Sequence, residues 1–271
     1  MDFRSARASD IDWLFGVLAQ SRSAPEGMLR SYLWELLRFE FTDIYYHTRK
    51  GEVDSVFCSF WFREDRIFEE WICDHGDYLG LLSQLLALRG GTKHIRIGSE
   101  AVGASLGWEL SDIAYEMKLD LRAMRASASA TKRAPVVDYD DCFRDATIDL
   151  LSEEWWTQEQ ARSFVDVGSL NQSGISKVLV SQGQPVAFCH ASRDGEAAWI
   201  SALYVSNKAR GKGYGRETLL GMEHTLAADR IRHVYLGVDA SSSPAIQLYE
   251  SLGFQFTSFK KYQFTPGGES A

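Results

Sequence analysis

A loop rich in glycine and positive charge lies between an apolar strand and a helix in the second half of the chain. Residues 197–205 form a strand-like apolar run, and apolar side chains recur at helical spacing from Leu219 to Leu226. The loop between them reads Ser206-Asn207-Lys208-Ala209-Arg210-Gly211-Lys212-Gly213-Tyr214-Gly215-Arg216. Its backbone N–H groups and the positive end of the helix dipole converge on one point, and glycines let an anion come close. The sequence therefore predicts a phosphate-binding site, with Arg210, Lys212 and Arg216 as cationic donors.

The glycine spacing excludes the two common nucleotide-binding loops. A Walker P-loop ends in Gly-Lys-Ser or Gly-Lys-Thr, and this loop has no such ending. The dinucleotide fingerprint needs a third glycine at position 216, where the chain has Arg216. The spacing is instead Arg-x-x-Gly-x-Gly, from Arg210 through Gly213 to Gly215.

With this spacing the chain resembles the GNAT superfamily of acyl-CoA-dependent N-acyltransferases, in which such a loop holds the pyrophosphate of coenzyme A. A second segment is similar to the family's Asn-x-x-Ala-x-x-Leu-Tyr-x-x-x-Gly-Phe motif, with Ser242 in place of the usual asparagine. That segment reads Ser242-Ser243-Pro244-Ala245-Ile246-Gln247-Leu248-Tyr249-Glu250-Ser251-Leu252-Gly253-Phe254. The resemblance implies acetyl-CoA as cosubstrate and the following coenzyme-binding residues: Leu203, Tyr204, Val205, Arg210, Gly211, Lys212, Gly213, Tyr214, Gly215, Arg216 and Ser242.

The second motif predicts a helix with Ser243 as its N-cap and Pro244 at its first position, ending before Gly253. The resemblance implies that Tyr249 is the general acid that protonates the departing coenzyme A thiolate. A phenol with an ordinary pKa of about 10 can donate a proton to a thiolate of pKa about 8.5. The resemblance also implies that the backbone of the Leu203 to Val205 strand pairs with the pantetheine arm as if with an added strand.

The sequence does not identify the general base. Family members often carry a glutamate on the strand before the phosphate loop, but counting back from Arg210 places Trp199 near that position. Glu196, His190 and Asp239 are the alternatives among the side chains. A water chain, or an amine of low pKa, would need no dedicated base, whereas an alkylamine of pKa about 10.4 must first lose a proton.

The chain is long enough for two domains of this kind, with 271 residues. A small, polar and basic stretch at residues 126–135 predicts a linker. The elements expected after it follow the family's order: a strand at 136–138, helices at 141–151 and 157–167, a hairpin at 175–181 and 185–192, the strand and loop helix described above, a strand at 233–239, the Tyr249 helix and a closing strand pair at 254–264.

Residues 1–125 repeat this order, with helices at 10–20 and 26–40, strands at 44–48, 55–63, 66–73 and 94–97, and a closing strand pair through residue 121. Gly107-Trp108 stands where the second half has Gly253-Phe254. We therefore predict an α/β fold of two tandem GNAT-like domains, each a mixed, mostly antiparallel twisted sheet flanked by helices. Residues 1–125 would be a degenerate domain and residues 136–271 the catalytic one.

The first half lacks a phosphate loop. Between Cys73 and Tyr78, where the loop should lie, the chain reads Asp74-His75-Gly76-Asp77. Its two carboxylates would repel a pyrophosphate. A polar turn is favoured over a metal site, because this spacing matches no familiar set of ligands. We expect the first half to have a structural role or to share in the acceptor pocket.

The composition narrows the class of partner. The net charge of −8 argues against nucleic acid and weakly favours a cationic amine as acceptor. The chain has no signal-peptide core and no apolar run of membrane-spanning length, so we predict a cytoplasmic enzyme without a membrane partner. The cysteines lack Cys-x-x-Cys pairs and predict buried free thiols without metal or disulfides. They are Cys58, Cys73, Cys142 and Cys189.

Three questions stay open at the level of sequence. Trp155 and Trp156, beside Glu153 and Glu154, are either a cage for a cationic amine or part of the seam against the first half. The expected activity is transfer of an acetyl group from acetyl-CoA to a primary amine of a small molecule or peptide. The alternatives are an acyltransferase that uses a longer acyl donor and a non-catalytic acyl-CoA-binding module; a homodimer is also left open.

Overall fold

The structure is a computed structural model of the chain. It describes residues 3–21, 24–39, 41–62, 65–73, 78–88, 92–122, 135–154 and 156–266. We refer to residues 3–122 as the N-terminal half and to residues 135–266 as the C-terminal half.

The two halves follow the same order of elements. The N-terminal half contains β1 (Arg4–Ser5), the 3-10 helix η1 (Ala8–Asp10), α1 (Ile11–Gln20), α2 (Arg30–Leu36), β2 (Thr42–Arg49), β3 (Glu52–Phe62), β4 (Asp65–Cys73), α3 (Tyr78–Leu88), β5 (Thr92–Ile97), α4 (Glu100–Ser105) and β6 (Trp108–Asp120). The C-terminal half contains β7 (Val136–Asp138), η2 (Asp141–Phe143), α5 (Arg144–Ser152), α6 (Gln158–Leu170), β8 (Gly174–Ser181), β9 (Gln184–Asp194), β10 (Ala197–Val205), η3 (Asn207–Ala209), α7 (Tyr214–Ala228), β11 (His233–Asp239), α8 (Ser243–Ser251) and β12 (Gln255–Pro266).

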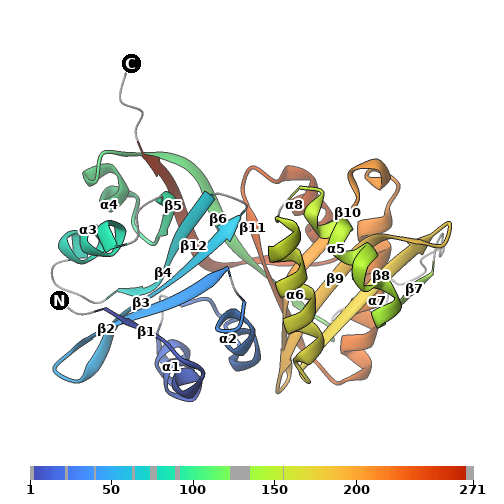
Figure 1. The fold of residues 1–271 in the computed structure, drawn as a ribbon, viewed down its shortest axis with the longest axis horizontal. Helices are drawn as coiled ribbons and strands as arrows, with labels where there is room; N and C mark the ends of the chain where they lie inside the picture. Colours follow the sequence, from blue (N-terminus) through green and yellow to red (C-terminus); the bar gives the residue numbers. More distant parts are fainter. Residues whose placement is uncertain are drawn as a thin grey trace.

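The described strands form one continuous twelve-stranded sheet in the order β1-β2-β3-β4-β5-β12-β6-β11-β10-β9-β8-β7 (Figure 1). Only β4 with β5 and β10 with β11 run parallel, and the other described neighbours are antiparallel. The predicted α/β fold with a mixed, mostly antiparallel sheet is confirmed. The two sheets that the sequence predicted are joined into one.

The closing strand pair predicted for each half is wrong. Each half ends in a single long strand, β6 or β12, and these two strands pair with each other. β12 lies between β5 and β6, and β6 lies between β12 and β11, so each half places its last strand beside a strand of the other (Figure 1). The backbone groups of both strands find partners on both edges in this way, which a local pattern of side chains does not reveal. The division at the predicted linker stays a prediction, because residues 126–134 lie outside the described residues.

The helices form two layers on the sheet. On one face, a single apolar core includes side chains of α1 and α2 from the N-terminal half and of α5 and α6 from the C-terminal half. On the other face the core is divided, with α3 and α4 in one cluster and α7 and α8 in the other. The shared layer makes the seam between the halves a continuous hydrophobic core.

Aromatic rings from both halves meet in this seam. Trp156 packs on Phe164 of α6, with ring centroids 4.6 Å apart, and on Phe41 of the N-terminal half at 5.7 Å. The interpretation of Trp156 as part of the seam is therefore correct, while Trp155 lies outside the described residues. Tyr32 of α2 likewise stacks on Trp199 of β10 at 5.4 Å.

Gly27 lets the N-terminal half approach the sheet of the C-terminal half. The sequence predicted a helix over residues 26–40, but α2 is shorter, because the segment before it lies against β10 and β11. A Cβ atom on Gly27 would lie 2.4 Å from the Cβ of Tyr235 and 2.7 Å from Cε3 of Trp199. Any side chain here forces the two surfaces apart.

The Gly27→Ala variant is expected to lower the free energy of unfolding by about 1–3 kcal/mol, the usual cost of overpacking. Urea unfolding would measure this. Gly16→Ala is the matched control, because Gly16 lies within α1 and an added Cβ meets nothing within 4 Å. That change is expected to be neutral or to stabilise by up to about 1 kcal/mol. Equal effects of the two substitutions would contradict the close approach at Gly27.

The cysteines match the prediction in part. Cys58 and Cys189 are buried and free. Cys142 is exposed, which contradicts the predicted burial, because it lies in the short surface helix η2 before α5. The side chain of Cys73 and the segment Asp74 to Asp77 lie outside the described residues.

Candidate active site

The strands β10 and β11 separate in the middle of the C-terminal half. They pair in parallel from Ala197 with His233 to Ile200 with Leu236, and pairing stops there. At the same level β10 carries a β-bulge between Ile200 and Ala202, which bends the strand away from its neighbour. We call this opening the splay. In the described structure, the backbone edge of Leu203 to Val205 that faces β11 is unpaired. An extended ligand that binds like an added strand needs such an open edge.

Ser201 lies at the bulge itself. Its hydroxyl is buried and has no hydrogen-bond partner among the described residues. Buried hydroxyls are normally paired, so an orphan at this point is available to a bound molecule. The sequence analysis missed Ser201, because the position of a bulge is not readable from the apolar run in which it lies.

The glycine loop folds as an anion cradle at the end of β10. Gly211 and Gly213 have φ angles of +75° and +85°, a left-handed conformation that glycine adopts without strain. Gly213 is the N-cap of α7, so the free N–H groups of the first turn begin here. At Gly215 an added Cβ would lie 3.4 Å from both Leu248 and Val205, which brings α7 close to β10 and α8. The loop therefore has the left-handed glycines and the free helix N-terminus that an anion-binding loop requires.

The cationic side chains of the loop differ in their surroundings. Arg210 donates from Nε to the carbonyl of Val205 at 3.2 Å, and its guanidinium forms an ion pair with Glu154. It also lies over the Tyr204 ring, 5.7 Å from the centroid. Lys212 and Arg216 are exposed. Arg210 is thus directed toward the segment between α5 and α6.

Two further residues of the predicted set make protein contacts. Tyr214 and Val205 both pack against the small core cluster of Leu179 and Ala187, and the Tyr214 hydroxyl lies 3.5 Å from Oγ of Ser181. The Tyr214 ring therefore supports the loop from beneath. Ser242 is the N-cap of α8, a position that the sequence analysis gave to Ser243, so Pro244 stands at the second helical position.

Tyr249 projects from α8 into the core beneath β10. The residue is 8% exposed, and its ring packs on Phe254 at 5.8 Å. Burial, and then the neighbouring thiol of Cys189, raise the pKa of Tyr249 above its ordinary value. Cys189 is the cross-strand partner of Leu203, so Tyr249 lies at the level of the open strand edge. Its hydroxyl makes no hydrogen bond to another described residue and keeps its proton at neutral pH.

None of the three candidate bases stands free at the splay. Glu196 lies at the start of β10, at the opposite end from the glycine loop, and pairs with Arg232. His190 is 1% exposed and is hydrogen-bonded through both ring nitrogens. Asp239 accepts two hydrogen bonds from Arg96 of β5, at 2.9 and 3.0 Å. The stacked indole of Trp199 occupies the place expected of the glutamate.

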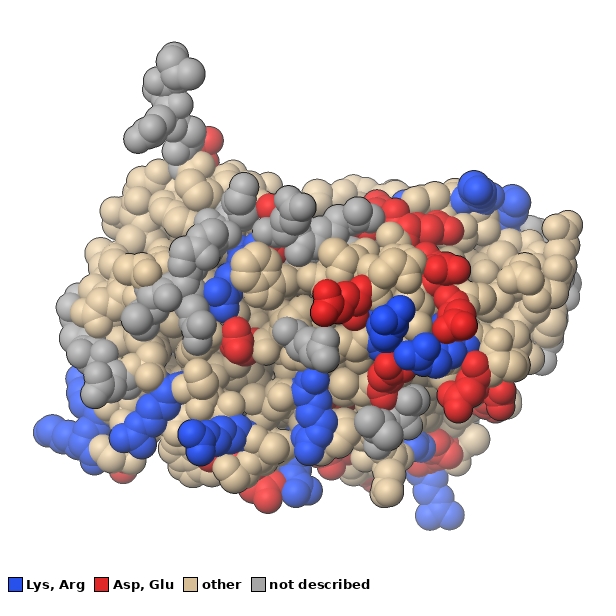
Figure 2. Space-filling view, in the orientation of Figure 1, with Lys and Arg blue, Asp and Glu red and all other residues tan. Residues whose placement is uncertain are grey.

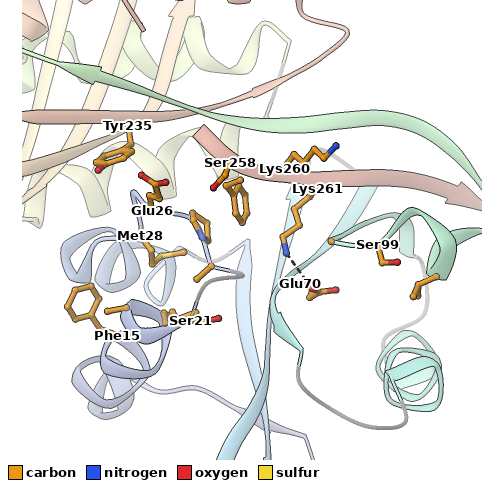
Figure 3. Close-up of a pocket in the computed structure, with 17 residues that line it drawn as sticks. Phe15, Ser21, Glu26, Met28, Glu70, Ser99, Tyr235, Ser258, Lys260 and Lys261 are labelled. Atoms are coloured by element: carbon orange, nitrogen blue, oxygen red, sulfur yellow. Dashed lines mark hydrogen bonds and ion pairs between the residues drawn. The ribbon is translucent and has the colours of Figure 1, made fainter. Parts of the chain in front are cut away.

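The N-terminal half has a splay of its own, where the pairing of β4 with β5 stops after Glu69 and Arg96. A cavity of about 1090 Å³ opens there. Figure 3 shows Glu70 and Lys261 joined beside this cavity, with Nζ of Lys261 3.3 Å from Oε1 of Glu70. Both side chains are buried, and the pair lies against Gly98, which follows β5. An ion pair thus fills space between these strand ends.

Acidic side chains gather on the face that carries α5 and α6 (Figure 2). Two of them hold the start of the glycine loop. Glu153 accepts hydrogen bonds from the backbone of Asn207 and from Oγ of Ser206, each at 2.9 Å, and Glu154 pairs with Arg210. No cluster of three or more metal-binding side chains occurs within the described residues. None of the described helices combines the length and apolar character needed to cross a bilayer.

Comparisons with known proteins agree with this geometry. Residues 134–254 match the model of the acetyltransferase (GNAT) family. Over 213 residues the chain is 30% identical to the mycothiol acetyltransferase of Acidothermus cellulolyticus, in an alignment covering 65% of this chain and 62% of that protein. The chain thus spans less than two thirds of that relative.

Solved structures share the fold along nearly the whole chain. A tandem GNAT protein from the clavulanic acid biosynthesis pathway superposes with a TM-score of 0.67 at 16% identity, covering 99% of both chains. A GCN5-related N-acetyltransferase from Sphaerobacter thermophilus superposes with a TM-score of 0.63 at 15% identity, covering 98% of this chain and 96% of that one. At these identities the likeness concerns the fold alone. The family-model match of residues 134–254, the similarity to a mycothiol acetyltransferase and the shared fold together support a GNAT acetyltransferase.

Proposed function

We propose that the chain is an acetyl-CoA-dependent N-acetyltransferase whose reaction takes place in the C-terminal half. The observation that carries this proposal is the splay of β10 from β11, at the strand that ends in the glycine loop and beneath which Tyr249 lies. The family match of residues 134–254 and the similarity to a mycothiol acetyltransferase support it.

Binding of acetyl-CoA would be divided between two backbone surfaces. The N–H groups of the loop from Gly211 to Gly215 and of the first turn of α7 would hold the pyrophosphate. The open edge of Leu203 to Val205 would pair with the pantetheine arm. The thioester would then lie near the bulge at Ser201, with Tyr249 on the α8 side.

In the reaction, the amine nitrogen of the acceptor attacks the thioester carbonyl, the C–N bond forms and the C–S bond breaks. Tyr249 donates its phenolic proton to the departing thiolate. The protonated amine loses one proton to water before the attack, and its nitrogen loses a second to water after the C–N bond has formed, since Glu196, His190 and Asp239 are all engaged elsewhere. Tyr249 regains its proton from solvent after the products leave.

The acceptor is proposed to be a primary amine that carries positive charge in solution. The net charge of −8 and the acidic side chains on the face that carries α5 and α6 would attract such a molecule electrostatically. A panel of amino sugars, α-amino acids, dipeptides and polyamines, with release of free coenzyme A thiol as the readout, would test turnover. Titration calorimetry with acetyl-CoA, longer acyl-CoAs and free coenzyme A would distinguish an acetyl donor from a longer one. Binding without thiol release on any amine would favour a non-catalytic module.

The Gly213→Asp variant tests the phosphate cradle. A carboxylate at this N-cap opposes the pyrophosphate, so the Kd for acetyl-CoA should rise by about 100-fold. Gly213→Asn is the matched control, because asparagine has the same shape, carries no charge and tolerates positive φ. It is expected to weaken binding only about tenfold or less. If aspartate and asparagine had equal effects in titration calorimetry, the loop would not face an anion.

A further inference from the structure

A buried carboxylate of the N-terminal half has its described side-chain hydrogen-bond partners in the C-terminal half. Glu35 of α2 is 0% exposed. Its Oε1 accepts a hydrogen bond from Nδ2 of Asn171 at 2.6 Å and lies 2.9 Å from Nε2 of His190. Its Oε2 accepts from Oγ of Ser192 at 2.6 Å. The charge is thus matched by three polar groups across the seam.

Two of these partners flank the bulge in β10. His190 and Ser192 are alternate residues of β9 on the face that α2 covers. In the sheet, His190 lies opposite Ala202 and Ser192 lies opposite Trp199, on the two sides of the interruption at Ser201. The two carboxylate oxygens of Glu35 therefore fix β9 just above and just below the point where β10 bends.

The niche around His190 is shaped for an imidazole. Nδ1 of His190 lies 2.7 Å from Oγ of Ser176, and the ring meets the Phe164 ring edge-on at 5.5 Å. An added Cβ on Gly168 or Gly174 would lie 3.1 or 3.0 Å from Cε1 of His190. Glycines at both positions thus make room for the ring and fix its plane.

The chain of contacts from Glu35 through His190 to Ser176 has the order of a hydrolytic triad. It does not act as one, because His190 is 1% exposed and lies beneath α6. Burial on its own would raise the pKa of Glu35, but His190, Ser192 and Asn171 outweigh it and lower that pKa, so the carboxylate is ionised at neutral pH. A network this buried and this fully paired holds its members rigidly.

We propose that Glu35 is the positioning residue through which the N-terminal half sets the geometry of β10. It holds His190 and Ser192, these hold β9, and β9 holds the bulge at Ser201 where the thioester would lie. At the bulge the backbone hydrogen bonds between β9 and β10 are interrupted. The side chains that hold β9 therefore contribute to fixing the position of β10 there. Misplacement of reacting groups by about 1 Å costs about 100-fold in rate. The inference rests on the proposed acyl transfer in the C-terminal half.

The test is Glu35→Gln in the full chain, assayed with the amine on which the wild type turns over fastest. Glutamine keeps the size but removes the charge and replaces one acceptor oxygen with an NH2 donor. That donor either opposes the NH2 of Asn171 or forces the Ser192 hydroxyl to reverse from donor to acceptor. We expect kcat to fall by about 10- to 100-fold, with the Kd for acetyl-CoA within about twofold of the wild type. A kcat within about twofold of the wild type would overturn the proposal.

Glu116→Gln is the matched control for a general loosening of the seam. Glu116 is also buried and also joins the halves, because its Oε1 accepts a hydrogen bond from Oγ1 of Thr257 in β12 at 3.0 Å, but it has no contact with β9 among its described bonds. The kcat of the Glu116→Gln variant is expected to stay within about twofold of the wild type. Equal losses of kcat in both variants would assign the effect of Glu35 to the seam as a whole and overturn the proposal.

Two further measurements keep the inference testable if Glu35→Gln folds poorly or no acceptor is found. Ser192→Ala removes one anchor, and its effect on kcat should be non-additive with that of Glu35→Gln. Hydrogen exchange needs no acceptor: the amides of Ala202 and Leu203 should exchange at least about tenfold faster in Ser192→Ala than in the wild type. Unchanged exchange of these amides would overturn the proposed link between Glu35 and β10. Faster exchange in a chain that acetylates no amine would contradict only the proposed function.

Discussion

Replacement of Tyr249 by phenylalanine is expected to lower kcat by about 10²- to 10⁴-fold, the usual contribution of a general acid, and to leave the Kd for acetyl-CoA within about twofold. The hydroxyl makes no hydrogen bond to another described residue, so its loss should not disturb the fold. Steady-state kinetics by thiol release would measure kcat. An unchanged rate at neutral pH would remove Tyr249 from the mechanism.

Tyr262→Phe is the control for this experiment, because Tyr262 packs in the separate core of the N-terminal half and should leave kcat within about twofold. The pH profile adds a second readout. Because burial raises the pKa of Tyr249, its proton is retained above the ordinary phenolic value. The rate should therefore show no loss from ionisation of this tyrosine below a pH of about 10. A fall of activity at lower pH that Tyr249→Phe abolished would contradict the raised pKa.

Replacement of Lys261 by methionine is expected to lower the free energy of unfolding by about 3–5 kcal/mol, since it removes the buried ammonium that lies against the Glu70 carboxylate beside the N-terminal splay. The side chains of Lys261 and Glu70 are 3% and 9% exposed, so solvent screens the pair little. Urea unfolding would measure the loss.

The double variant Lys261→Met with Glu70→Gln is the control for charge. It removes both ions and keeps the volume, so it should recover most of the stability lost in the single variant. If the double variant were as unstable as Lys261→Met alone, packing rather than charge would explain the loss. Lys261 lies in β12 and Glu70 in β4, so this pair also measures how firmly the last strand is held in the N-terminal half.

The elements that depend on local sequence patterns were predicted from the sequence. The strands at residues 197–205 and 233–239 have the predicted bounds, because apolar runs bounded by turns fix them. Gly211 and Gly213, which the sequence analysis expected to let an anion come close, adopt positive φ angles. The resemblance to a known family identified the helix of Tyr249, and the structure places this residue beside the open strand edge.

The features that depend on contacts between residues far apart in the sequence were not predicted. The periodicity of residues 108–120 and 255–266 shows strands but does not show that each pairs with the other half. Glu35 and His190 are separated by 155 positions, and the sequence around either residue does not indicate that they form a hydrogen bond. The role of Gly27 depends on what lies across the seam, since the same glycine within a lone helix would only weaken it.

The placement of β12 has a consequence for how the chain is made. A ribosome synthesises the N-terminal half first, yet the sheet of that half is complete only when residues 255–266 insert between β5 and β6. Until then the edges of β5 and β6 are unpaired and available to other chains. The sheet of the N-terminal half is therefore completed only after β12 has been synthesised. The full chain, rather than either half, is the unit that folds.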